Sequence, residues 1–136
     1  RINKIKHREA FRPFAASIKL SHVHKWFDMA GMDDSPHMMY AVDALEYTWD
    51  KIPAVLHVDH TCRIQTVTID QNEHYYRLID AFCQITGVPL LFNTSFNMAG
   101  DPLVETPEDA IKCFEETDID ALYFPEVAKL RAKSTL

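Results

Sequence analysis

The sequence lacks the features that mark membrane-spanning, secreted and repetitive proteins. No apolar run approaches the ~18 residues that suggest a membrane span, no signal peptide is visible, and no repeat or low-complexity segment occurs. Cysteine is scarce, and Cys62, Cys83 and Cys113 are far apart and odd in number. That pattern argues against a disulfide framework and favours a reducing, cytoplasmic setting. We expect these thiols to be small buried side chains rather than nucleophiles.

The remaining composition is that of one globular domain. Apolar residues make up 47% and charged residues 25% of 136 residues, which is enough for a single hydrophobic core. The chain begins at Arg1 in a helix-like pattern, so we expect residues 1–136 to be a single partial domain, the C-terminal part of a larger protein. From residue 126 on the sequence is polar, and we predict a mobile tail over 126–136.

Positive charge is concentrated at the start of an otherwise acidic chain. The net charge is −6, yet residues 1–25 contain seven basic residues against the single acid Glu9. A protein that binds nucleic acid over its whole surface is usually basic overall. A local excess of cations in an acidic body instead favours a confined site for a small anion.

Helical and strand-like segments alternate, which is typical of an α/β or α+β fold. The clearest helix is predicted over 70–86, with Gly87 closing it. A second is predicted over 106–116, where Thr106 can cap the helix and a proline follows at the first helical position. The apolar face of the first helix consists of Tyr75, Leu78, Ile79, Phe82 and Ile85. Shorter helices are predicted over 1–9 and 21–29, the latter with Ser21 as N-cap and with Val23, Trp26 and Phe27 on one face. Strands are predicted over 14–20, 38–45, 53–59, 62–69, 88–92 and 121–124.

Two short stretches carry side chains suited to an anion. The first stretch contains Lys6, Arg8 and Arg12, and Pro13 is expected to end its helical pattern. Guanidinium and ammonium groups such as these bind phosphate or carboxylate. The alternative is a solvated helix face, but the flanking phenylalanines should anchor the segment to the core. The second stretch is the polar run 93–97 after an apolar strand, where α/β proteins place ligand-binding groups. Its alternative is an ordinary turn.

A third stretch, residues 57–63, contains two histidines, an aspartate and a cysteine. The spacing of His57, Asp59, His60 and Cys62 matches no strong zinc signature, and no second cluster of ligands accompanies it. We therefore predict no metal in this chain. Arg63, which follows, is a further cation that can face the same anion.

Three blocks of sequence resemble the C-terminal domain of the O-carbamoyltransferases, a family that includes nodulation and antibiotic-biosynthesis carbamoyltransferases. They are INKIKHREAFRPFAAS (2–17), PAVLHVDHTCRIQTVT (53–68) and TGVPLLFNTSFNMAGDPLVETPEDAIKCFEETDIDAL (86–122). The order and spacing of the blocks cover nearly the whole chain. The sequence departs from the family pattern at Ala16, where proline is usual, at His60, where glycine is common, and at 98–101.

The resemblance implies a mixed twisted sheet flanked by helices, as in the threonylcarbamoyl-adenylate synthase fold, here incomplete at its N-terminus. It implies a domain that takes carbamoyl phosphate and ATP as substrates and forms carbamoyl adenylate. This product would then be passed to an actin-like ATPase-type N-terminal domain of the same polypeptide. That domain would hold the metal, Fe or Mg, and pass the carbamoyl group to a hydroxyl of a small-molecule or glycan acceptor. The resemblance assigns catalytic phosphate binding to Lys6 and Arg12, and substrate or nucleotide binding to Arg63, Ser95, Asn97, Arg8 and Asn93.

Three other functions stay open. One is a threonylcarbamoyl-adenylate synthase-like protein of tRNA modification, and another is an RNA-binding module that uses the basic N-terminal stretch. The third is an interaction domain that binds no small anion. A membrane partner is not expected, and nucleic acid is disfavoured by the acidic total charge.

Overall fold

The computed structural model describes residues 1–7, 9, 11 and 14–133, and these fall into two compact units. The first unit joins the two ends of the chain, residues 1–12 and 95–136. The second unit is the continuous segment 13–94. The expectation of a single partial domain stays a prediction.

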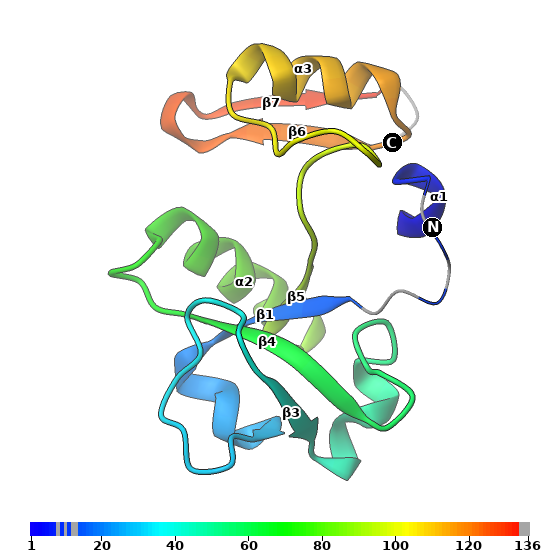
Figure 1. Ribbon diagram of the computed structural model, residues 1–136. Helices are drawn as coiled ribbons and strands as arrows, with labels where there is room; N and C mark the ends of the chain where they lie inside the picture. Colours follow the sequence, from blue (N-terminus) through cyan, green and yellow to red (C-terminus); the bar gives the residue numbers. More distant parts are fainter. Residues whose placement is uncertain (8, 10, 12–13, 134–136) are drawn as a thin grey trace. The chain divides into compact units, whose positions relative to one another are not determined.

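The second unit is built on a mixed five-stranded sheet in the order β2-β3-β4-β1-β5 (Figure 1). Strands β1 and β4 pair in parallel, and the other neighbours pair antiparallel. The strands are β1 (Ala15–Lys19), β2 (Phe27–Asp28), β3 (Ala41–Ala44), β4 (Thr61–Val67) and β5 (Leu90–Asn93). The predicted class, a mixed sheet with helices in an α/β arrangement, is confirmed.

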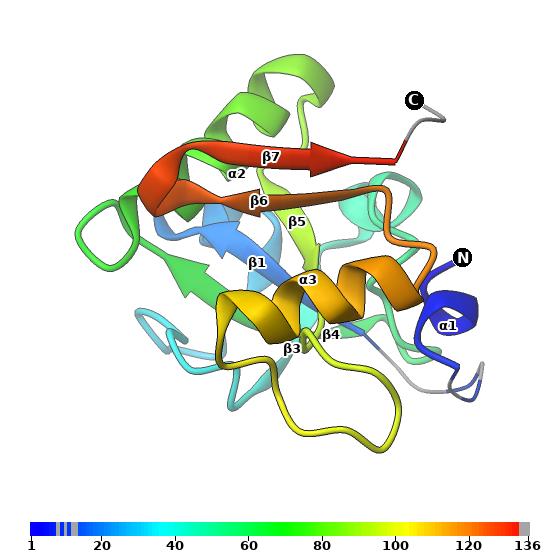
Figure 2. The ribbon, with the colours of Figure 1, turned by 90° about the horizontal axis from the view of Figure 1, so that it is seen from above.

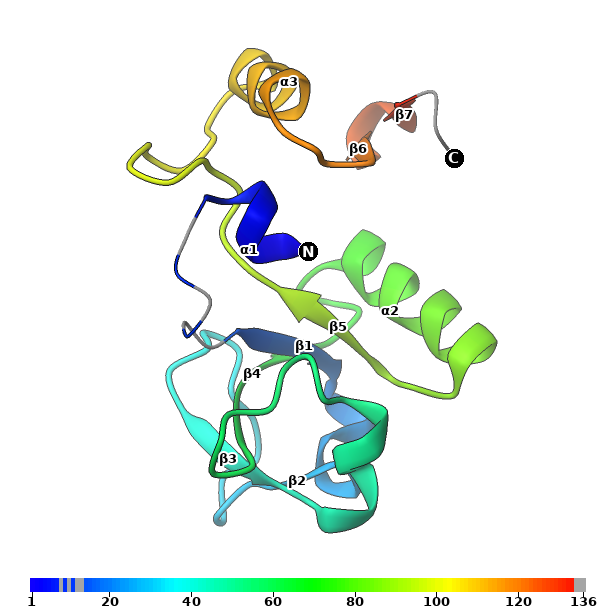
Figure 3. The same cartoon turned by 90° about the vertical axis from the view of Figure 1, so that its right-hand side faces the viewer.

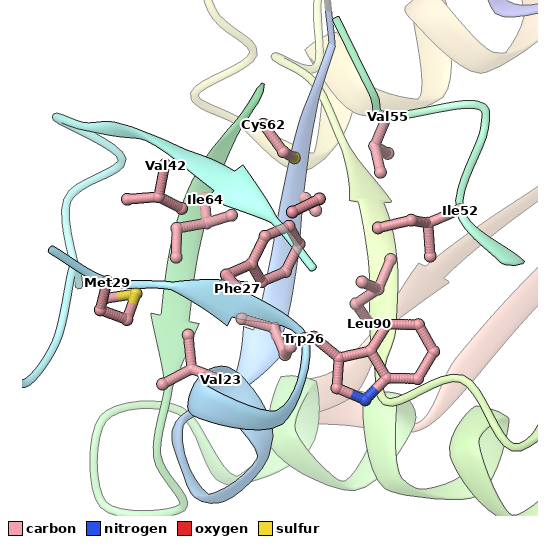
Figure 4. Packing of buried hydrophobic residues seen from close by; sticks show 13 residues of the cluster. Val23, Trp26, Phe27, Met29, Val42, Ile52, Val55, Cys62, Ile64 and Leu90 are labelled. Carbon is pink, nitrogen blue, oxygen red and sulfur yellow. The ribbon is translucent and has the colours of Figure 1, made fainter. Parts of the chain in front are cut away.

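The two faces of β1 differ in chemistry, although all five of its residues are buried. Because side chains alternate along a strand, Ala16 and Ile18 face one side and Ser17 and Lys19 the other. Ala16 and Ile18 belong to the main hydrophobic core, which also contains Val23, Trp26, Phe27, Met29, Val42, Ile52, Val55, Cys62, Ile64 and Leu90 (Figure 4). Ser17 and Lys19 lie on the face that carries polar groups, and Lys19 pairs there with Asp80 of the long helix.

That long helix, α2 (Glu73–Thr86), lies next to β5, as Figure 3 shows. The side chain of Asn72 caps its first turn by accepting from the Tyr75 backbone N–H at 2.9 Å. Gly87 ends it with φ +74°, as predicted, because a left-handed residue there suits glycine. The predicted apolar face is wrong in part: Ile79 is fully buried, but Leu78, Phe82 and Ile85 are exposed.

Two predicted elements of the second unit are wrong. Residues 21–29 form no α-helix, since the 3₁₀ helix η1 (Leu20–Lys25) leads directly into β2. Ser21 caps nothing there, and its hydroxyl instead contacts the ring of His22 at 3.0 Å. Val23, Trp26 and Phe27 are nevertheless buried as expected. Residues 53–59 form turns rather than a strand, because the backbone reverses before β4 with the His57 N–H bonded to the Thr61 carbonyl at 2.8 Å.

The first unit contains α1 (Ile2–Ile5), α3 (Pro107–Glu116) and a two-stranded antiparallel sheet. The strands are β6 (Ala121–Phe124) and β7 (Lys129–Ala132), and α3 runs beside them (Figure 2). Thr106 and Asp109 form the reciprocal capping box that the sequence indicates for α3. The apolar sides of α3 and β6 meet in a small core of Ala110, Phe114 and Leu122.

No element was predicted beyond residue 126, yet β7 forms there and pairs along the whole of β6. Mobility of residues 126–136 stays a prediction, and 134–136 lie outside the described residues. The cysteines are free thiols, with Cys62 and Cys113 buried and Cys83 partly exposed. None of the helices in the described part of the chain is long and apolar enough to cross a membrane.

Candidate anion-binding sites

In the first unit, one lysine joins the two ends of the chain. Lys6 follows α1, whose Ile5 is buried, and Lys6 as a whole residue is only 9% exposed. Its ammonium Nζ donates to the Ser95 carbonyl at 2.5 Å, to Ser95 Oγ at 2.8 Å and to Asn97 Oδ1 at 3.0 Å. The structure therefore brings together three residues that the resemblance assigns to the site, across 89 positions of sequence.

The loop that presents Ser95 and Asn97 is anchored by the residue between them. Phe96 packs against the small core of the first unit, so its two polar neighbours are held outside that core. The Phe96 carbonyl accepts from the Val104 N–H at 3.0 Å, which closes the loop. Within the loop, Ser95 Oγ lies 2.6 Å from Asn97 Oδ1, and Asn97 Nδ2 donates to the Asp101 carbonyl at 2.8 Å. These bonds orient both side chains toward the lysine.

A polar cavity of about 270 Å³ lies beside this cluster. Its walls within the described residues are Lys6, His7, Glu9, Ser95, Asn97, Met98, Ala99 and Gly100. Lys6 contributes a positive charge to this wall, while its three N–H donors are engaged by Ser95 and Asn97. Glu9 adds a carboxylate to the same lining, so the cavity wall carries both signs of charge.

In the second unit, Arg63 and Asn93 lie in one row across the sheet. The register pairs Ala15 of β1 with Arg63 of β4 and with Asn93 of β5. Residues in register across neighbouring strands point to the same face, so the arginine and the asparagine stand on either side of a small alanine. Arg63 is exposed, Asn93 is partly buried, and Ala15 is buried.

The next row of the same face holds a polar network that the sequence did not reveal. Asn93 Nδ2 donates to Ser17 Oγ at 2.6 Å and to Gln65 Oε1 at 2.9 Å, and Ser17 Oγ donates to Gln65 Oε1 at 2.9 Å. Gln65 Nε2 donates to the Pro36 carbonyl at 3.2 Å. The one signal in the sequence is that Ser17 interrupts a stretch that is otherwise mostly apolar, whereas Gln65 lies in a strand with several other polar residues. Their meeting required the strand order, which spacing alone does not give.

The stretch 57–62 holds its polar groups in local contacts. Asp59 Oδ1 accepts from the backbone N–H and the hydroxyl of Thr61 at 3.1 and 2.8 Å, and these bonds lower the pKa of Asp59. Burial raises the pKa of the Cys62 thiol to about 12. His60, where glycine is common in the family, adopts φ +63° and stacks on Trp49 with ring centroids 3.6 Å apart. Among the described residues, no three His, Cys, Asp or Glu side chains gather in a group able to hold a metal.

Two of the predicted site residues, Arg8 and Arg12, lie outside the described residues. The other five fall into two groups, each within one unit: Lys6 with Ser95 and Asn97, and Arg63 with Asn93. The binding roles of all seven stay predictions.

Comparison with known proteins gives one consistent result. The family described as "Carbamoyltransferase C-terminus" matches residues 1–130. The chain is 41% identical to the nodulation protein NolNO of Sinorhizobium fredii over 124 residues, which are 90% of this chain and 18% of that protein. It is 35% identical to the 3'-hydroxymethylcephem-O-carbamoyltransferase of Streptomyces clavuligerus over 119 residues, 88% of this chain and 22% of that enzyme. The nodulation protein NolO of Bradyrhizobium diazoefficiens is 40% identical, with 90% of this chain and 23% of the relative covered. The chain thus spans about a fifth of the length of the curated relatives it matches.

Proposed function

Since this chain belongs to the carbamoyltransferase C-terminal family, we propose that it binds carbamoyl phosphate and ATP and forms carbamoyl adenylate. In the balanced reaction, carbamoyl phosphate, ATP and water give carbamoyl adenylate, phosphate and pyrophosphate. The carbamoyl group then passes to a hydroxyl of a small-molecule or glycan acceptor. The acceptor, an actin-like partner domain with its Fe or Mg ion, and a cytoplasmic location likewise stay predictions.

The observation that carries the proposal is the Lys6 cluster. Lys6 is nearly buried, and a carbonyl, a hydroxyl and a carboxamide of the loop hold its ammonium beside the polar cavity. A positive charge fixed on the wall of a polar cavity favours an anionic ligand such as a phosphate. Fixed cationic donors also stabilise charge that builds up as a phosphoryl or acyl bond breaks, without reorganising during the reaction.

Two lysines of the same short helical segment make a matched test. Lys6→Met removes the ammonium and keeps an unbranched side chain, while Lys4→Met makes the same change at an exposed position. We expect Lys6→Met to weaken carbamoyl phosphate binding by the full-length protein by about 10- to 100-fold, the value of one charge-assisted contact. Lys4→Met should bind as the wild type does. Phosphorus NMR line broadening measures both, and equal affinities in the two variants would refute the assignment of Lys6.

Formation of the adenylate has its own readout, which also separates the open alternatives. Labelled pyrophosphate should exchange into ATP only when carbamoyl phosphate is present. Exchange that requires threonine instead would support the threonylcarbamoyl-adenylate synthase-like reading. Binding to RNA that falls steeply with salt would support an RNA-binding module, and a folded protein that binds none of these ligands would support an interaction domain.

A further inference from the structure

Asn93 is held by two acceptors from neighbouring strands, and this arrangement fixes which way its carboxamide points. The chain of bonds starts at the Pro36 carbonyl, which can only accept, so Gln65 must turn its Nε2 toward it. Gln65 then turns its Oε1 to the sheet, where it accepts from Ser17 Oγ and from Asn93 Nδ2. The amide nitrogen of Asn93 is therefore directed into the sheet.

The consequence is that the other atom of the Asn93 carboxamide, Oδ1, is turned away from the network. Among the residues that the structure describes, no donor reaches Asn93 Oδ1, although its Nδ2 makes two hydrogen bonds. A side-chain carbonyl oxygen of fixed direction on a partly buried residue is an acceptor for a ligand N–H. It stands in the same row as Arg63, with only the methyl group of Ala15 between them.

We propose that Asn93 Oδ1 accepts a hydrogen bond from the carbamoyl NH₂ group of the substrate, and that Ser17 and Gln65 are positioning residues that hold it for this purpose. The inference rests on the proposed function and names the atom that distinguishes a carbamoyl from an acyl donor. Two strand spacings, about 10 Å, separate the Arg63 and Asn93 backbones. An extended arginine side chain is long enough to span much of that distance, so Arg63 can place a positive charge near a ligand held by Asn93.

The geometry explains why a carboxamide suits this position. An aspartate would turn a second oxygen toward Gln65 Oε1, so acceptor would face acceptor. A leucine would fill the space without offering an acceptor. Asparagine both anchors on its neighbours and presents an acceptor to the ligand.

Acetyl phosphate is the discriminating probe, because it replaces the carbamoyl NH₂ by a methyl group and keeps the phosphate. Affinities of the full-length protein for carbamoyl phosphate, acetyl phosphate and inorganic phosphate are measured by calorimetric titration. We expect the wild type to bind carbamoyl phosphate at least about fivefold more tightly than acetyl phosphate, the value of one hydrogen bond. Asn93→Leu should reduce this ratio to about one, by weakening carbamoyl phosphate alone.

Gln65→Met tests the positioning role, with Gln84→Met as its control. Gln84 is an exposed glutamine of α2 that bonds only to Asp80 among the described residues. Gln65→Met should lower the carbamoyl-to-acetyl ratio, whereas Gln84→Met should leave it at the wild-type value. A merely structural role of Gln65 would weaken both phosphates in the same proportion and would overturn that part of the inference.

The outcomes separate this inference from the proposed function. If carbamoyl and acetyl phosphate bind with equal affinity, or if Asn93→Leu leaves their ratio unchanged, the inference fails while anion binding stands. If none of the three phosphates binds to the folded wild type, the proposed function fails and the inference fails with it. Circular dichroism of each variant confirms that the comparison is made between folded proteins.

Discussion

The ion pair between Lys19 and Asp80 allows a sharp test of how the second unit carries charge on the polar face of its sheet. Lys19 is the last residue of β1, and only 6% of its side chain is exposed, against 38% for Asp80 on α2. The ammonium donates to Asp80 Oδ1 and lies 5.7 Å from the centre of the Tyr76 ring. The two charges therefore have very different access to water, and removing one is not equivalent to removing the other.

Asp80→Ala would leave a nearly buried ammonium without its carboxylate. Leaving a nearly buried ammonium without its carboxylate costs more than the roughly 1 kcal/mol of an exposed ion pair. The nearby Tyr76 ring offsets a small part of this cost. Lys19→Met leaves a carboxylate that water can reach and keeps the aliphatic packing, so the loss should be only about 1 kcal/mol. We expect Asp80→Ala to lower the free energy of unfolding more than Lys19→Met does.

Urea denaturation followed by tryptophan fluorescence measures this difference within the second unit, because Trp26 and Trp49 both lie there and the chain has no other tryptophan. Arg77→Met is the control, since it removes an exposed cation that pairs with Glu73 on the same helix. An exposed pair contributes little, so this variant should match the wild type. Equal or greater destabilisation by Lys19→Met would refute the reasoning.

The pH dependence gives an independent check with a definite sign. Burial of the Lys19 ammonium acts to lower its pKa, but the hydrogen bond and the charge of Asp80 outweigh it and raise the pKa overall. The hydrogen bond from Lys19 lowers the pKa of Asp80. The stabilisation is therefore complete between about pH 4 and pH 10, the unfolded values of the two groups. It is lost as the pH falls through the folded pKa of Asp80 or rises through that of Lys19, and the stability difference between wild type and Asp80→Ala should shrink at both ends.

Two further predictions concern single side chains. Cys62 should stay unmodified by iodoacetamide at pH 8 in the folded protein while Cys83 reacts, because Cys62 is fully buried with a pKa of about 12. Peptide mass spectrometry measures the modification of each cysteine, and rapid labelling of Cys62 would contradict its burial. Thr106→Ala should lower the free energy of unfolding by about 1 kcal/mol, because it removes the N-cap of α3. Hydrogen exchange at the Asp109 amide should become faster, and unchanged exchange there would contradict the capping role.

Helix ends that are set by one or two residues nearby in the sequence could be predicted. Gly87 and Thr106 mark helix ends by their own backbone and side-chain chemistry, and the structure confirms both. The prediction of an α-helix over 21–29 was wrong because a spacing of three residues between apolar side chains fits a 3₁₀ helix as well as an α-helix. The prediction of a strand over 53–59 was wrong because the chain turns there and His60 adopts a left-handed backbone conformation. The histidine side chain gives no indication of that conformation in the sequence.

The candidate site was predictable only as far as its residues match a family pattern. Ser95 and Asn97 are neighbours in sequence, and their alternation with Phe96 already separates polar from apolar directions. Their contact with Lys6 spans 89 positions and follows from the tertiary fold, so no local pattern contains it. The same holds for Ser17, Gln65 and Asn93, which meet because β1 lies between β4 and β5.

The polar face of β1 connects these findings to function. Apolar residues at the positions of Ser17 and Lys19 would stabilise the fold more simply. Each buried polar group must find partners to offset its desolvation. Both do find partners, in Gln65 and Asp80, so the face is a completed polar layer and not a defect of the core. Departures from simple apolar packing of this kind are expected where a structure serves a site. The network of Ser17 and Gln65 ends at Asn93. If Asn93 Oδ1 accepts from a ligand as proposed, holding that oxygen in place accounts for Ser17 and Gln65, whereas Lys19 serves the contact with α2.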